Sequence, residues 1–213
     1  MEKYQNKIYS IGYATYTIES FINTLKKFNI TAIVDVRSQP YSQFKPEFNR
    51  ETLKQTLKKS GIEYAFLGNK LGARIKAPEC YKNGQVDYHL VAKHPLFQEG
   101  LWHIKNGMQK HIIALMCAEK DPINCHRMIL ICRSLKKLGH TIYHVLDTDK
   151  VETQAESEFR LLKLFKLNQL DLFQSKNDQL EQAYDKQGER IAYKEDSSSI
   201  DQNGEEDFIY DEC

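Results

Sequence analysis

The sequence lacks the long apolar runs of membrane proteins. No stretch approaches the roughly 18 apolar residues that a membrane-spanning helix requires, and the opening segment Met1–Lys7 has no apolar signal-peptide core. We therefore expect a cytoplasmic protein with no membrane partner. No internal repeat is visible either, and the length of 213 residues fits one domain with an appendage.

Cysteine is scarce and follows no framework pattern. The five cysteines are Cys80, Cys117, Cys125, Cys132 and Cys213. An odd number of scattered cysteines indicates free thiols in a reducing compartment and argues against a disulfide scaffold. Because Cys132 lies in an apolar helical run, we expect it to be a buried core thiol.

The small net charge of +1 conceals two unlike parts. Residues 1–174 contain 26 Lys and Arg against 17 Asp and Glu, whereas residues 175–213 contain 4 against 12. A basic domain suits a polyanion such as DNA, although it is also consistent with a solvated basic face. We expect an α/β domain over residues 1–173 and a flexible, poorly ordered acidic tail over 174–213, with a short docking segment at Phe208–Tyr210.

Segments typical of strands and of helices alternate along residues 7–167. The expected strands are Lys7–Gly12, Ala32–Arg37, Ile62–Leu67, His111–Met116 and Thr141–Leu146, and the expected helices begin near Thr17, Asn49, Pro95, Asp121 and Glu152. This alternation predicts a three-layer α/β fold with a mainly parallel sheet of about five strands flanked by helices. In such folds the functional residues follow the carboxyl ends of strands.

Charged and aromatic residues do follow three of these strands. Tyr13 follows the first strand, Asp35 and Arg37 end the second, and Glu119 comes shortly after the fourth. A charge beside a buried strand is costly unless it is paired. Asp35 and Arg37 are therefore expected to have partners, either in an active site or in a network that only supports the loops.

The segment Met116–Arg127, after the fourth strand, is the most informative. Asp121 and Pro122 are typical of a helix start, where backbone N–H groups can hold an anion, with Arg127 one turn further on. Glu119 is placed to activate water or to stabilise a developing cation. The alternative is that Glu119 is solvated and Asp121 only caps the helix.

Two cysteines and a histidine in this segment allow two further interpretations. Cys117, Cys125 and His126 form a C-x7-C-H pattern, which lacks the close cysteine pairs of structural zinc sites and offers three ligands. The sequence therefore assigns no metal and no cofactor. Cys117 is either a reactive thiol beside a helix start or a packed residue at the end of a strand.

Two loops, Gln39–Arg50 and Gly68–Gly84, interleave aromatic and basic residues. Proteins that bind single-stranded nucleic acid or a flipped base use cations to contact phosphates and aromatic rings to stack on bases. Aromatic residues in loops also simply cover the core. The residues concerned are Tyr41, Phe44, Lys45, Arg50, Arg74 and Lys76.

Five motifs together point to one family. They are Ile11-Gly12-Tyr13, Val34-Asp35-Val36-Arg37-Ser38, Phe48-Asn49, Met116-Cys117-Ala118-Glu119-Lys120 and Cys125-His126-Arg127. In this combination, over residues 7 to 147, the chain resembles the bacterial domain-of-unknown-function family numbered 488. It departs from the usual family form at Tyr13, where the family has His, and this puts a role for that position in doubt. The resemblance implies an α/β domain, an association with genome-maintenance or defence genes and a role in DNA base excision.

We therefore expect a DNA N-glycosylase that excises a modified or damaged base, in defence against phage. Departure of the base leaves an oxocarbenium-like sugar, so a carboxylate is required, from Asp35 or Glu119. Arg37 or Arg127 would hold a phosphate or the departing base, and His126 would protonate that base. The other expected substrate contacts come from Tyr13, Tyr41, Phe44, Lys45, Arg50, Arg74, Lys76 and Cys117.

Two other functions remain open. The first is a rhodanese-like sulfurtransferase using Cys117, but rhodaneses place an arginine a few residues after the cysteine, whereas Arg127 is ten residues away. The second is a nucleic-acid-binding module without enzymatic activity, whose acidic tail gates the basic face. Deleting the tail should then tighten DNA binding in a salt-dependent way.

Overall fold

The computed structural model describes residues 6–169 and 173–195, and its centre is a six-stranded sheet in the order β3-β2-β6-β1-β7-β8. The strands are β1 Lys7–Gly12, β2 Ala32–Asp35, β3 Glu63–Phe66, β6 Ile113–Cys117, β7 Thr141–Val145 and β8 Val151–Thr153. The first five are parallel to one another, and β8 pairs antiparallel with β7 at the edge. The five predicted strands are confirmed to within two residues at each end.

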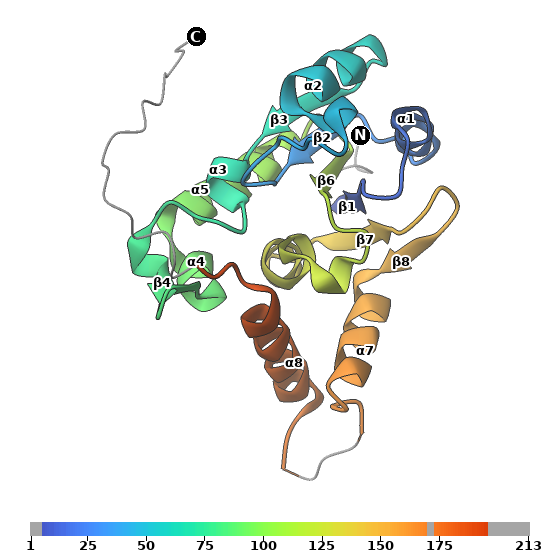
Figure 1. Cartoon of the computed structure of the whole chain (residues 1–213). Coiled ribbons are helices and arrows are strands. Elements are labelled where there is room, and N and C mark those ends of the chain that lie inside the picture. The colour runs from blue at the N-terminus through green and yellow to red at the C-terminus, as the bar shows by residue number, and fades with distance from the viewer. Residues whose placement is uncertain (1–5, 170–172, 196–213) are drawn as a thin grey trace, which may run out of the picture.

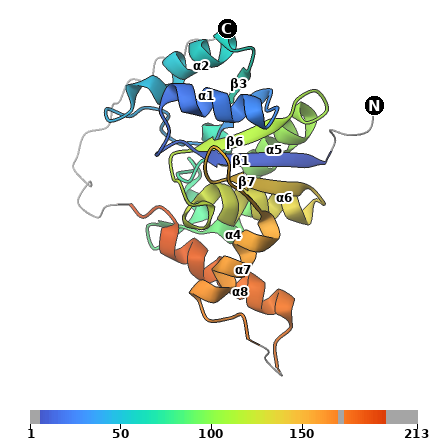
Figure 2. The ribbon, with the colours of Figure 1, turned by 90° about the vertical axis from the view of Figure 1, so that its right-hand side faces the viewer.

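Helices cover both faces of the sheet, as Figures 1 and 2 show. One face carries α1 Ile18–Lys27 and α2 Arg50–Lys59, and the other carries α4 Tyr88–Lys93, α5 Pro95–Gly107, η4 Arg127–Cys132 and α6 Arg133–Lys137. Each face has its own apolar cluster, one around Phe21 and Leu53 and one around Phe97 and Ile131. The predicted three-layer α/β fold is therefore confirmed. None of the helices in the described ranges has the length and apolar character needed to cross a bilayer.

Polar residues set the helix starts next to the sheet. Thr17 caps α1 because its hydroxyl accepts a hydrogen bond from the Ser20 backbone N–H at 3.2 Å, and Ser20 returns the bond to complete a capping box. Asn49 precedes α2 as predicted, but its side-chain oxygen accepts instead from the Ser42 N–H at 2.7 Å. Asn49 thereby ties the loop after β2 to the start of α2.

The helix expected to start at Asp121 begins later. Pro122–Asn124 forms a single 3₁₀ turn, η3, after which Cys125 is extended with φ −133° and ψ 138°. The helical segment starts at Arg127 with a π turn, η4, and continues as α6. The cluster of free N–H groups expected at a helix start is therefore not formed at Asp121, which caps one short turn and pairs with Arg160.

The poorly ordered tail expected from Gln174 onward is wrong for residues 176–191, which form helix α8, Lys176–Ile191. This helix packs beside α7, Gln154–Leu164, and buries Ala183 and Tyr184 in the apolar core. Its polar composition conceals this apolar face. Residues 196–213, including the predicted docking segment Phe208–Tyr210, lie outside the described residues.

The segment Gly68–Gly84, expected to be a long loop, contains short regular elements. These are α3 Gly68–Leu71, the 3₁₀ turn η2 Pro78–Cys80 and the strand β4 Tyr81–Lys82, which pairs with β5 Gln85–Val86. The backbone N–H of Arg74 donates to the Ser38 hydroxyl at 2.8 Å. This bond holds the middle of the segment against the loop that follows β2.

Candidate functional site

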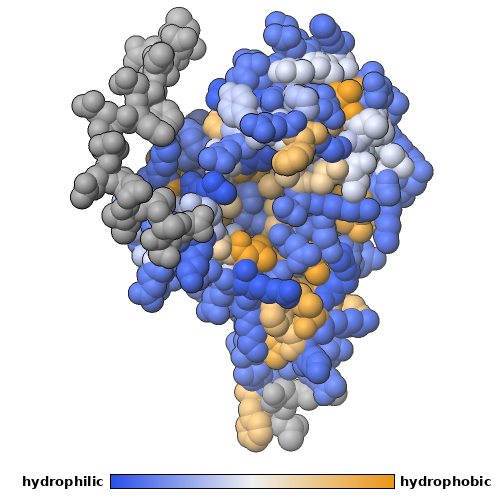
Figure 3. Space-filling model, in the orientation of Figure 1, coloured by the Kyte–Doolittle hydropathy of each residue, from blue (hydrophilic) through white to orange (hydrophobic). Residues whose placement is uncertain are grey.

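A cleft of about 420 Å³ lies at the carboxyl ends of the parallel strands. Strands β2 and β6 are neighbours, but the connections that follow them run in opposite directions across the sheet. The connection after β2 leads to β3 at one edge, and the connection after β6 passes β1 and leads to β7. In open α/β sheets such a switch point is where ligands bind, and the volume is within the usual range for ligand pockets. Figure 3 shows a mostly hydrophilic face on this side of the molecule, with apolar side chains gathered near its middle.

The structure brings together seven of the predicted site residues. Those that line the cleft are Tyr13, Arg37, Tyr41, Arg74, Cys117, Glu119 and His126. The predicted residues that do not line it are Asp35, Phe44, Lys45, Arg50, Lys76 and Arg127. The cleft therefore receives side chains from three strand ends, as expected, while several cations lie elsewhere.

Asp35 lies beneath the cleft and is 0% exposed. Its carboxylate accepts from Arg37 Nε at 2.9 Å, from Arg37 Nη2 at 2.6 Å and from the Tyr64 hydroxyl at 2.8 Å. The Arg37 backbone N–H also donates to it, at 3.0 Å. These four donors occupy both oxygens, so the contacts of Asp35 are those of a support for Arg37.

Arg37 lies between this support and the cleft. Its Nη2 also donates to the Phe48 carbonyl at 2.9 Å, and its Nη1 donates to the Tyr13 hydroxyl at 3.1 Å. Burial acts against the charge, but the hydrogen bonds and charge of Asp35 outweigh it and raise the pKa of Arg37. Of the five N–H groups of this guanidinium, the second one on Nη1 makes no hydrogen bond to the described residues. Tyr13 in turn stacks on Phe48 at 4.4 Å between ring centres.

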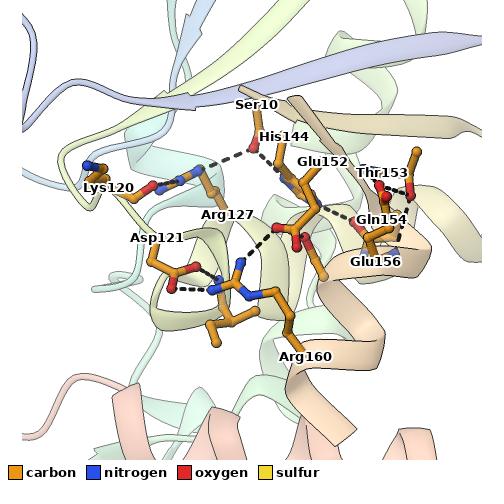
Figure 4. Close-up of polar contacts among 12 residues, drawn as sticks. Ser10, Lys120, Asp121, Arg127, His144, Glu152, Thr153, Gln154, Glu156 and Arg160 are labelled. Atoms are coloured by element: carbon orange, nitrogen blue, oxygen red, sulfur yellow. Dashed lines mark hydrogen bonds and ion pairs between the residues drawn. The ribbon is translucent and has the colours of Figure 1, made fainter. Parts of the chain in front are cut away.

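Arg127 is also fully buried and supports the loop that carries Glu119. It donates from Nη1 to the Glu119 carbonyl at 2.5 Å and from Nη2 to the Lys120 carbonyl at 2.9 Å. Its Nε donates to the Ser10 hydroxyl at 3.3 Å, as Figure 4 shows. With these bonds, Arg127 positions the Glu119 loop and does not point into the cleft.

A chain of buried hydrogen bonds continues from Ser10 away from the cleft (Figure 4). Ser10 bonds His144 Nδ1 at 2.7 Å, and His144 Nε2 bonds the Gln154 side-chain oxygen at 2.7 Å. The Gln154 amide donates to the Tyr184 hydroxyl at 2.6 Å, which donates to Glu158 at 2.9 Å. This series of hydrogen bonds thus links Arg127, which supports the Glu119 loop, to α7 and α8.

Glu119 is the exposed carboxylate of the cleft. Its loop lies directly over the end of β1, where a Cβ added to Gly12 would be 1.7 Å from the Glu119 carbonyl oxygen. Only glycine permits this close approach. Gly12 and Arg127 together fix the backbone of Glu119, whose side chain is exposed.

The predicted basic and aromatic contacts are spread more widely. Lys45 donates to the Tyr16 carbonyl at 2.5 Å, Arg50 lies over the Phe66 ring, and Phe44 is 97% exposed outside the cleft. Lys76 lines a neighbouring pocket that shares Arg74 with the cleft. Tyr41, 58% exposed, remains as an aromatic ring at the cleft.

A compact group of Cys117, Cys125 and His126 lies on the cleft wall. Their two sulfur atoms and His126 Nδ1 all lie within 4.8 Å of one another, and all three residues are buried. The hydrogen bond with Cys125, together with burial, raises the pKa of Cys117 well above its usual value. Burial opposes ionisation of Cys125, but the hydrogen bond from Cys117 and the charges of Arg127 and His126 outweigh it and lower the pKa of Cys125.

His126 has a partner at each ring nitrogen. Nε2 lies 3.0 Å from the Val36 carbonyl oxygen, which can only accept, and Nδ1 lies 3.9 Å from the Cys117 sulfur and 3.8 Å from the Cys125 sulfur. The ring therefore faces the thiols. This placement does not support its predicted role of protonating a departing base.

Sequence reasoning did not select several residues that line the cleft. They are Ser38, Gln39, Ser42, Ala73, Tyr88, Ala118, Asn124 and Ile191. Tyr88 comes from α4 and Ile191 from the end of α8, and neither position carries a local motif. Gln187 of α8 donates to the Asn124 side-chain oxygen at 3.0 Å and so fixes η3 at the cleft.

One comparison with known proteins agrees with the motifs in the sequence. Neither a curated protein nor a solved structure matches the chain. The family model described as "Domain of unknown function DUF488" matches residues 17–133, which is more than half of the chain and includes β2, β6 and the Cys125-His126-Arg127 motif. The chain therefore belongs to the DUF488 family.

Proposed function

We propose that the chain is a DNA N-glycosylase that uses Glu119 to remove a modified or damaged base from a flipped nucleotide. The observation that carries the proposal is an exposed carboxylate in a nucleotide-sized cleft that also contains the Arg37 and Arg74 guanidinium groups. A positively charged, aromatic-lined pocket is what a flipped nucleotide requires.

The reaction assigns one role to each of three side chains. Glu119 takes a proton from a water molecule as the water oxygen bonds the sugar C1′. The bond between C1′ and the base nitrogen breaks, and its electron pair leaves with the base. The free N–H of Arg37 stabilises the charge on the departing base until solvent protonates it, and the Tyr41 ring stacks on the nucleotide.

Asp35 supports the reaction indirectly in this proposal. It is 0% exposed and bonded to Arg37 through three side-chain contacts between 2.6 and 3.1 Å. Its charge therefore keeps the Arg37 guanidinium in place at the cleft. Arg127 does the same for the Glu119 loop through two carbonyl oxygens.

Two observations on Cys117 weigh against a sulfurtransferase. The thiol is only 7% exposed, and the raised pKa disfavours the thiolate that persulfide chemistry requires. Cys125, whose pKa is lowered, is 2% exposed. Neither sulfur is presented to the solvent as a nucleophile.

The test is the formation of abasic sites. Purified protein is incubated with unmodified DNA and with phage DNAs that carry modified bases, and abasic sites are titrated with an aldehyde-reactive probe. We expect abasic sites on at least one modified DNA with the wild-type protein and none with Glu119→Gln.

Glu63→Gln is the matched control, because Glu63 is an exposed carboxylate at the opposite, amino end of the sheet. It should retain full activity. Absence of abasic sites on every DNA, or full activity in Glu119→Gln, would refute the proposal. In the first case, tight salt-dependent DNA binding without cleavage would identify a binding module instead.

A further inference from the structure

We infer that Cys117, Cys125 and His126 bind a zinc ion on the wall of the cleft. The inference is independent of the glycosylase proposal, because it rests on the positions of three ligand atoms. The two sulfur atoms and His126 Nδ1 lie within 4.8 Å of one another. Two sulfurs and one imidazole nitrogen are the ligands that zinc prefers, whereas Mg²⁺ and Ca²⁺ require oxygen.

Both sulfur–nitrogen distances are close to those of a tetrahedral site. Zinc lies about 2.3 Å from sulfur and about 2.0 Å from nitrogen, so tetrahedral geometry places a sulfur and a nitrogen ligand about 3.6 Å apart. His126 Nδ1 lies 3.9 Å from the Cys117 sulfur and 3.8 Å from the Cys125 sulfur. The two sulfurs lie within 4.8 Å of each other, against about 3.8 Å in a tetrahedral site, and side-chain rotation would bring the three ligands together.

The surroundings of the ligands are those of a metal site. The Val36 carbonyl accepts the Nε2 proton of His126 at 3.0 Å, which leaves the lone pair on Nδ1 directed at the two sulfurs. Metal-binding histidines characteristically donate their second ring N–H in this way.

A second observation points to a ligand at the same place. The Tyr88 side chain lines the cleft and is 8% exposed, and within residues 6–169 and 173–195 its buried hydroxyl has no hydrogen-bond partner. A buried hydroxyl without a partner costs about 1–3 kcal/mol. A water molecule or substrate atom on the open coordination position of the zinc would supply the missing partner.

The number of ligands distinguishes the kind of site. Structural zinc sites have four protein ligands, whereas sites with three protein ligands keep the fourth position for water or substrate. Here three ligands line a cleft that also contains Glu119. The geometry thus points to an open zinc site on the wall of the cleft that Glu119 also lines.

The test measures bound metal and does not depend on activity. The full chain is purified with a reductant, stripped with a chelator, dialysed against Zn²⁺ or Co²⁺ and analysed by mass spectrometry for metal content. We expect one equivalent per chain and, with Co²⁺, the intense visible bands of tetrahedral coordination together with a thiolate-to-cobalt charge-transfer band. Cys125→Ser and His126→Gln should lose both signals.

Cys132→Ser is the matched control, because Cys132 is an equally buried thiol, at the end of η4, but lies outside the group of three. It should retain the metal. Should a variant fail to fold, Cd²⁺ titration of the wild-type chain decides, with thiolate-to-cadmium absorption expected for two thiolates. A reduced wild-type chain that binds no metal, or a Cys117–Cys125 disulfide in the protein as isolated, would overturn the inference.

Discussion

Replacing Asp35 with Asn separates a supporting carboxylate from a catalytic one. Asp35 is 0% exposed and its partner Arg37 is 5% exposed. The substitution keeps the size of the side chain but leaves the Arg37 charge without its partner. It also brings the new amide N–H groups against the donors of Arg37 and Tyr64. Removing one member of a buried ion pair costs about 3–5 kcal/mol.

For a chain of this length, 1 kcal/mol corresponds to about 2–4 °C in Tm. We therefore expect Asp35→Asn to lower Tm by roughly 6–20 °C. Glu119 is exposed, so Glu119→Gln should change the free energy of unfolding by less than about 0.5 kcal/mol while abolishing activity.

Urea unfolding followed by circular dichroism measures both variants. Tyr64→Phe, which removes a single hydrogen bond to Asp35, is the matched control and should cost about 1 kcal/mol. If Asp35→Asn is as stable as the wild type but inactive, Asp35 takes part in the chemistry and the assignment of its role as support is incorrect.

Three further predictions follow from buried groups and close contacts. Burial, and then the charge of Arg127, lowers the pKa of His144 to about 3 from 6.5. As pH falls from about 6.5 to 3, the unfolded chain therefore binds a proton that the folded chain does not. The free energy of unfolding should decrease by up to about 1.4 kcal/mol per pH unit in that window. In His144→Gln, the free energy of unfolding measured by urea titration should depend less on pH. Gly12→Ala places a Cβ 1.7 Å from the Glu119 carbonyl and should abolish base excision and lower stability by about 1–3 kcal/mol, whereas Gly61→Ala, with open space around it and φ +72°, should cost about 1 kcal/mol and retain activity. Deleting residues 174–213 removes the buried Ala183 and Tyr184 and should unfold the protein. Deleting residues 196–213 removes seven acidic and no basic side chains. This shorter deletion should tighten DNA binding at low salt, as fluorescence anisotropy would show.

The sheet and its active edge could be predicted because their signals are local. The central strands β2 and β6 are short, buried and mainly apolar runs, and Thr17 marks the start of α1 through its own hydrogen bond. The alternation of these segments fixes which strand ends face the same way. Tyr13, Arg37 and Glu119 could therefore be assigned to one cleft before their distances were known.

The roles of individual charges could not be predicted, because they depend on contacts between distant segments. Asp35 ends a buried strand and Glu119 follows one closely, but the donors that surround Asp35 include Tyr64 from β3. Arg127 was expected to bind substrate, yet it contacts Ser10, which is 117 residues away in the sequence. No local pattern indicates either partner.

The thiol group and α8 illustrate the same limit in two ways. The spacing of Cys117, Cys125 and His126 does not match common zinc motifs. The three side chains lie close together because the backbone is extended at Cys125, between η3 and η4. The apolar face of α8 consists of a few residues, among them Ala183 and Tyr184, within a strongly polar segment. Composition therefore indicates a tail where the structure has a packed helix.

The most direct test of the proposed function identifies the product of the reaction. DNA carrying a modified base is incubated with wild-type protein, and the small molecules and the remaining strand are both analysed by mass spectrometry. Our account predicts release of the intact base and a strand lighter by that base and heavier by one water, with neither product formed by Glu119→Gln. A base of altered mass that remains in the strand, or the same products from Glu119→Gln, would contradict it.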